Sequence, residues 1–246
     1  MTHTNKETMK IFNERGIPIE QALENCLNAN YRPLFMPHLA DARINGQIPW
    51  DQKGISTPSI RITGQTKQGS QVVVYVHTPT SLATPEGIKA AKQRGLSGWQ
   101  DGAARFPQEE FQSLVNQDGK TDVQSNRLIW VVDYNSLQKA PYGPIFYLDA
   151  LVHPHTIPFL GGQERAELYL AALQKAEGPV GIDMSCRSDP IHHESPLARF
   201  LYLGYREFIN HELEVTWNHS LIADFHLKRY GTFLGVRSTT TGEASK

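Results

Sequence analysis

The sequence has little cysteine, since Cys26 and Cys186 are the only two among 246 residues. Two thiols so far apart, with no C-x-x-C pair, exclude a disulfide framework, a zinc ribbon and a dithiol redox site. Cys26 falls at helical spacing with Ile19 and Leu23, which predicts a small core residue. Cys186 has polar neighbours instead, and it is therefore a candidate nucleophile.

The sequence also lacks an excess of either charge, since 24 lysines and arginines stand against 25 aspartates and glutamates. A formal net charge of −1 gives no long-range field that would draw the protein onto nucleic acid or an anionic membrane. The stretch 205–231 mixes basic and aromatic residues, but its interleaved acids cancel most of the local field. The sequence thus argues against nucleic acid and membrane partners, and it identifies no other partner.

No apolar run is long enough to cross a bilayer, which takes about 20 residues. The longest runs, 72–76 and 128–132, are those of buried strands. The first residues contain no apolar core of the signal-peptide type, so we expect a soluble, cytoplasmic protein. Length and composition predict one globular domain over 1–237, with an N-terminal helical wrap at 1–57 and a disordered polar tail at 238–246.

What the sequence does contain is an interleaving of helix and strand patterns. Two apolar runs around a polar turn predict a hairpin at about 59–76, and helical spacing predicts two N-terminal helices at 5–15 and 19–29. The fold class is therefore α/β or α+β mixed, with a central mixed sheet.

The clearest helix pattern in the chain lies at 163–177, between two apolar runs. The first run also suits a helical turn, but its order fits a strand, which would complete a βαβ unit at about 145–184. This unit would comprise strand 145–152, helix 163–177 and strand 180–184. Parallel strands end at the same edge of a sheet, so the loops that follow them would emerge side by side.

Four of the ten histidines lie on these two loops: His153, His155, His192 and His193. Two imidazoles two residues apart project to the same side of an extended segment. With a carboxylate from the other loop they would form a three-ligand zinc site with an open position for water. Zinc would lower the pKa of that water towards 7 and supply hydroxide for hydrolysis.

Asp189 and Glu194 are the candidate further ligand or base for that site. Alternatively, Cys186 would act as a nucleophile with His192 or His193 as its base. Separately, the backbone at 161–163 precedes a helix and would suit an anion. Each feature also has an ordinary structural interpretation, because a pair of histidines in a proline-flanked loop is commonly hydrogen-bonded or at the surface.

Two hypotheses for the function follow, and the sequence leaves open whether the protein is an enzyme. A non-catalytic binding or accessory protein is slightly favoured, because no specific catalytic motif such as H-E-x-x-H occurs in the chain. The alternative is a small metal-dependent hydrolase that uses the histidines of the two loops, with zinc as the expected cofactor.

Overall fold

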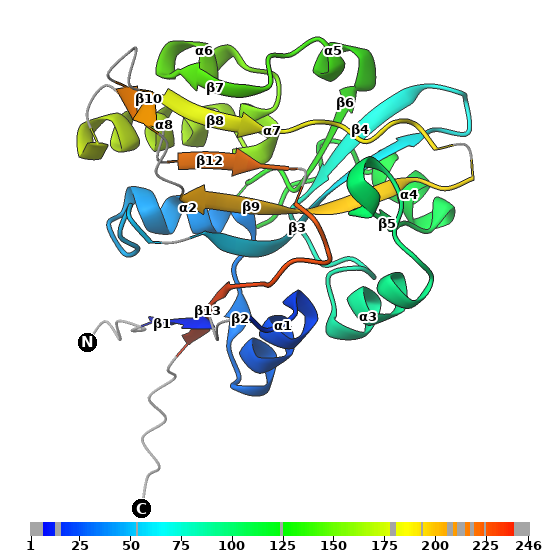
Figure 1. Cartoon of the computed structure of the whole chain (residues 1–246), viewed down its shortest axis with the longest axis horizontal. Coiled ribbons are helices and arrows are strands. Elements are labelled where there is room, and N and C mark those ends of the chain that lie inside the picture. The colour runs from blue at the N-terminus through cyan, green and yellow to red at the C-terminus, as the bar shows by residue number, and fades with distance from the viewer. Residues whose placement is uncertain are drawn as a thin grey trace, which may run out of the picture.

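The computed structural model describes residues 7–12, 16–52, 54–123, 125–177, 181–192, 194–205, 209–210, 215–216, 219–223 and 225–238. Within these ranges a mixed sheet of eleven strands forms the centre of the molecule (Figure 1), and two further strands pair only with each other as a ribbon. The sheet contains β1 (Glu7–Phe12), β2 (Arg32–Pro33), β3 (Ile55–Gln65), β4 (Gln71–Val76), β5 (Ala104–Arg105), β6 (Ile129–Asp133), β7 (Gly143–Phe146), β8 (Gly181–Ser185), β9 (Leu197–Tyr205), β12 (His219–Ile222) and β13 (Phe233–Ser238). The ribbon is formed by β10 (Ile209–Asn210) and β11 (Val215–Thr216).

The strand order of the sheet is β1-β13-β3-β9-β12-β8-β7, and β4 and β6 continue from β3. β1 pairs antiparallel with β13, so strands near the two ends of the chain lie together. The register between β3 and β9 shifts between Ser56 and Ile60, next to Pro58. Proline has no N–H to donate to a strand ladder, which explains an interruption at this point.

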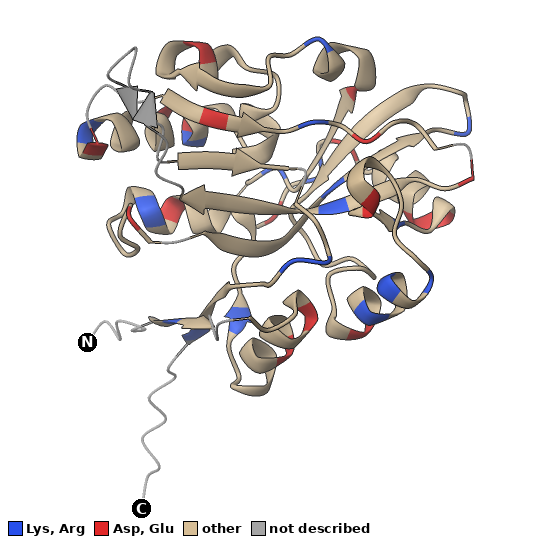
Figure 2. Ribbon diagram, viewed as in Figure 1, with Lys and Arg blue, Asp and Glu red and all other residues tan. Residues whose placement is uncertain are grey.

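Eight α-helices and one short 3-10 helix are described, and most of them pack on the sheet. They are α1 (Ile19–Asn28), α2 (Met36–Ile44), α3 (Pro85–Gln93), η1 (Trp99–Asp101), α4 (Gln108–Val115), α5 (Tyr134–Gln138), α6 (Tyr147–Val152), α7 (Thr156–Leu160) and α8 (Gln163–Glu177). None of the helices in the described part of the chain has the length and apolar character to cross a membrane. Basic and acidic residues are interspersed over the molecule (Figure 2).

Alternation along the strands divides the core in two. In β4, Val73 and Tyr75 pack with α2, α7 and α8, whereas Val74 and Val76 pack on the other side with residues of α1, α3 and α4. This is the pattern of a strand buried on both faces, and it accounts for the uninterrupted apolar run there.

Several sequence predictions are confirmed. The mixed α/β class is correct, and the predicted hairpin is the antiparallel pair β3 and β4. The second N-terminal helix is α1 and the helix at 163–177 is α8, which buries Ala166, Tyr169, Leu170 and Leu173 as its spacing indicated. The predicted tail at 238–246 lies, beyond Ser238, outside the described residues.

The predicted βαβ unit is wrong. Its first strand, 145–152, is mostly the helix α6, and the short strand β7 runs antiparallel to β8. Leu148 and Val152 of α6 are largely exposed. Apolar residues therefore lie on more than one side of this helix, and the sequence shows no clear helical period there. The strand that pairs in parallel with β8 is β12.

The N-terminal segment also differs from its prediction. Residues 7–12, within the predicted helix 5–15, form the strand β1, because pairing with β13 overrides a weak local preference. The predicted wrap at 1–57 also contains the helix α2, where Pro37 occupies the first helical turn, a position that tolerates proline.

Candidate functional site

Three neighbouring strands carry polar and small residues on the face opposite to Met184, Leu203 and Leu221. Asp183 of β8 lies beside Ser220 of β12, which lies beside Gly204 of β9. The next row, two residues along each strand, is formed by Ser185, Ile222 and Tyr202. Residues between these rows, including Met184, Leu203 and Leu221, point to the opposite face and pack in the core.

These two rows form the floor of a cavity of about 380 Å³, which we name the aromatic cavity. Its remaining wall residues are Trp99, Tyr142, Tyr205, Phe225, His226 and Arg229. Phe225 stacks on Tyr202 with ring centres 4.9 Å apart, and Trp99 meets His226 edge to face at 5.7 Å. The floor is tightly packed at Gly204, because an added Cβ would come within 3.0 Å of Ser220 and Ile222.

Polar atoms of the aromatic cavity are available for a ligand. His226 is nine-tenths buried, and its Nε2 has no hydrogen-bond partner among the described residues. Burial lowers the pKa of His226, as do the nearby charges of Arg199 and Arg229, so its ring is neutral at pH 7. The carboxylate of Asp183 accepts a hydrogen bond of 2.9 Å from the Ser185 hydroxyl and remains partly exposed.

A buried arginine–aspartate cluster of Arg61, Asp189 and Arg199 contacts the backbone of Trp99, a wall residue of the cavity. Arg199 donates to both oxygens of Asp189 at 2.6 and 2.7 Å, and Arg61 approaches the same carboxylate at 4.0 Å. Asp189 also accepts from the backbone N–H of Trp99 at 2.9 Å. Burial alone would raise the pKa of Asp189, but Arg199 and Arg61 hold it below its usual value. The cluster thereby fixes the loop that carries Trp99.

A second cavity, which we name the polar cavity, has a volume of about 210 Å³ and reaches His155, Cys186, Arg187 and Ser188. The hydroxyl of Tyr75 makes a very short hydrogen bond with His155 Nδ1. Burial and the charge of Arg61 place the pKa of His155 well below its usual value, so the imidazole is neutral. The Cys186 thiol donates to the Leu221 carbonyl at 3.3 Å.

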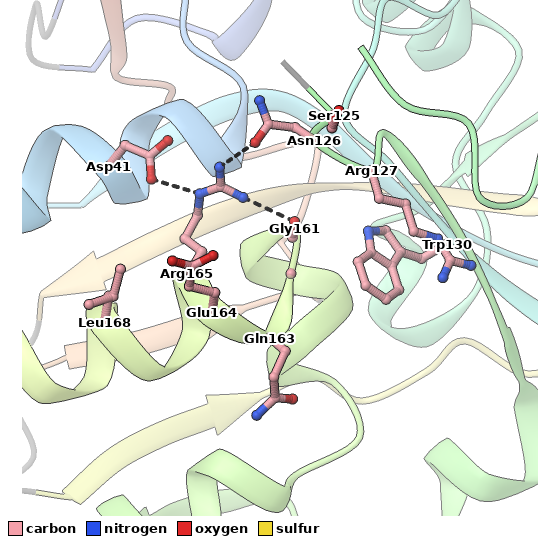
Figure 3. Close-up of a pocket in the computed structure, with 11 residues that line it drawn as sticks. Asp41, Ser125, Asn126, Arg127, Trp130, Gly161, Gln163, Glu164, Arg165 and Leu168 are labelled. Atoms are coloured by element: carbon pink, nitrogen blue, oxygen red, sulfur yellow. Dashed lines mark hydrogen bonds and ion pairs between the residues drawn. The ribbon is translucent and has the colours of Figure 1, made fainter. Parts of the chain in front are cut away.

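A third cavity, of about 450 Å³, lies at the N-terminus of α8 (Figure 3). Its central side chain, Arg165, is held by Asp41 at 2.7 Å, Asn126 at 2.8 Å and the Gly161 carbonyl at 3.0 Å (Figure 3). The N–H groups of Gly161 and Gly162 both donate to the Ile157 carbonyl. Arg165 joins α8 to α2 and to the end of α7, and the two glycine N–H groups close α7, which does not favour the anion predicted at 161–163.

No family model and no curated protein matches the chain. A solved structure from Nanoarchaeota, described as showing how the C-type lectin fold accommodates massive sequence variation, superposes with a TM-score of 0.72. It is 34% identical, and the alignment covers 96% of this chain and 99% of that chain. The chain belongs to this C-type lectin-fold family.

In this C-type lectin-fold protein the predicted metal ligands lie in different local environments. His153 and His155 are both buried and stack with ring centres 5.4 Å apart, but His153 Nε2 donates to the Pro141 carbonyl. His192 accepts from the backbone of Glu194 through Nδ1, and His193 lies outside the described residues. In the part of the chain that is described, no three His, Cys, Asp or Glu side chains are grouped to hold a metal ion.

The three residues predicted as catalytic also separate. Asp189 is committed to the buried cluster, and Glu194 forms a surface ion pair of 3.2 Å with Arg105. Cys186 does reach the same cavity as His155, although the parallel strands that were expected to bring them together do not exist. Catalytic and zinc-binding roles for these residues stay predictions.

The residues of the aromatic cavity were missed by the sequence analysis. The alternation of core and cavity positions in 197–205, and the many aromatic residues between 199 and 230, were the available signals. Neither reveals that segments 183–185, 202–204 and 220–222 lie side by side.

Proposed function

We propose that this C-type lectin-fold protein is a binding protein and that the aromatic cavity is its recognition site. The observation that carries the proposal is the alignment of polar and small residues from three strands under a wall of aromatic rings. Ligand sites typically combine such apolar and aromatic walls with a few placed polar groups.

The cavity is also preformed. The buried arginine–aspartate cluster holds the Trp99 loop through hydrogen bonds to both its N–H and its carbonyl group, the latter from Arg199 at 2.7 Å. A wall fixed before binding loses little conformational entropy on binding, which favours affinity.

Variation of the cavity residues is compatible with this fold. Core-facing positions such as Leu203 and Leu221 supply the packing, whereas their neighbours Gly204 and Ser220 face the cavity. At the polar floor positions Asp183 and Ser220 the side chain can therefore change without removing apolar core contacts. This supports a relation to the Nanoarchaeota protein, whose fold is described as accommodating massive sequence variation.

Fragment screening by protein-observed NMR tests the proposal without a known ligand. We expect hits from a library of small polar aromatic fragments to shift the backbone signals of Asp183, Gly204 and Ser220. Ser185→Trp should fill the cavity and abolish these shifts, whereas Leu168→Trp, on the exposed side of α8, should preserve them. Hits that gather elsewhere, or that survive in Ser185→Trp, would contradict the proposed site.

A further inference from the structure

The polar cavity contains a cation that no described acid neutralises. Arg187 is exposed, and its guanidinium lies 5.2 Å from the ring centre of Trp99 and 4.9 Å from that of Tyr142. No aspartate or glutamate is among the described residues that line this cavity. Arginine keeps its charge at any physiological pH, so the cavity has a positive end.

The inner wall supplies a hydroxyl group. Ser188 is more than nine-tenths buried, it lines the cavity, and its Oγ has no hydrogen-bond partner among the described residues. An unpartnered buried hydroxyl costs free energy, and a ligand that accepts a hydrogen bond from it would recover that cost.

His155 supplies a third donor. The Tyr75 hydroxyl keeps its proton, because burial raises the pKa of that phenol well above its usual value. It therefore donates to His155 Nδ1, and the one proton of the neutral imidazole resides on Nε2. His155 lines the same cavity as Ser188, so its N–H group is a candidate donor to a ligand there.

We propose that the polar cavity is a binding site for a small carboxylate, held by Arg187, Ser188 and His155. A planar carboxylate suits the parallel N–H groups of one guanidinium and has lone pairs left for two further donors. A volume of about 210 Å³ suits a small ligand. A single arginine matches one negative charge better than the two of a phosphate.

Acetate titration followed by NMR tests this site independently of the aromatic cavity. At constant ionic strength, acetate should give saturable shifts of the Arg187 and Ser188 amides, two residues that line the polar cavity and not the aromatic cavity. Arg187→Gln, at an exposed position, should weaken acetate binding about tenfold or more. Ser188→Ala should weaken it about fivefold, with an unchanged melting temperature as the check on folding.

Arg237→Gln provides the matched control. Arg237 is also exposed and also stacks on an aromatic ring, Tyr31 at 4.9 Å, but it lies outside the polar cavity. This variant should bind acetate like the wild type. Shifts that do not saturate, equal affinity in Arg187→Gln, or tighter binding of inorganic phosphate than of acetate would each overturn the proposal. None of these outcomes bears on the aromatic cavity.

Discussion

Asp189 offers a sharp distinction between a structural and a catalytic role. The structure gives it two close hydrogen bonds from Arg199, one from the Trp99 backbone and the nearby charge of Arg61. All three ionic side chains are at most 1% exposed. Replacing the aspartate would thus leave two arginine charges in the interior without their counter-ion.

Asp189→Asn should therefore lower the free energy of unfolding by about 3–5 kcal/mol, the usual cost of removing one partner from a buried ion pair. Urea unfolding followed by circular dichroism measures this change. The free energy of unfolding of a domain is about 5–15 kcal/mol in total, so the loss should be plain. Release of the Trp99 loop should also alter tryptophan fluorescence under native conditions.

Glu194→Gln is the matched control, since Glu194 is 72% exposed in its pair with Arg105. A surface pair of this kind contributes about 0–1 kcal/mol, so the variant should unfold almost as the wild type does. A loss below about 1 kcal/mol in Asp189→Asn would refute the argument that the cluster holds the cavity. It would also restore Asp189 as a candidate catalytic group, whose removal need not affect stability.

Three further predictions follow. Burial lowers the pKa of His77 to about 4 and of His219 to about 3. The unfolded chain takes up these protons near pH 6.5, so the free energy of unfolding should fall as the pH is lowered from about 6.5 towards 4 and 3, by up to ~1.4 kcal/mol per histidine and pH unit. A flat profile in urea unfolding over this range would contradict these assignments. Gly161→Ala should destabilise the protein by more than Gly95→Ala in the same assay. Both glycines have a positive φ, but only at Gly161 would the new Cβ meet a neighbour, Pro37 Cγ at 2.5 Å. Equal losses would show that Pro37 moves aside. Purified protein should contain less than one zinc per chain, and the same amount in a His153→Ala/His155→Ala variant. Stoichiometric zinc that the variant loses would instead support the hydrolase hypothesis.

The spacing of apolar residues predicted two kinds of element correctly: helices with one buried face, and strands that are buried on both faces. α8 has a single apolar face against the core, and β4 is buried on both faces, so their spacings alone identify them. β1 and α6 are different. The strand character of β1 comes from β13, which is more than two hundred residues away in sequence. α6 buries only Ala150, so its apolar residues do not distinguish a helix from a strand.

The approach of His155 to Cys186 shows that a correct neighbourhood can follow from a wrong topology. The sequence analysis relied on two parallel strands with a helix between them. In the structure His155 precedes α7 and its ring hydrogen-bonds to Tyr75 of β4. Cys186 follows β8, and its thiol donates to the Leu221 carbonyl of β12. The contacts of His155 with β4 and of Cys186 with β12, and not a shared strand direction, place the two residues at one cavity. Convergence of this kind is therefore weak support for a shared metal site.

The aromatic cavity depends on the register between its strands, which cannot be read from a single sequence. Gly204, Ser220 and Asp183 form one row only because β9, β12 and β8 pair with these residues opposite each other. A shift of one residue in β12 would turn Ser220 into the core and Leu221 out to the cavity. The apolar residues that alternate with the cavity positions prevent this shift, because each must stay buried. The core thus fixes the register, and the register determines which residues meet in the cavity.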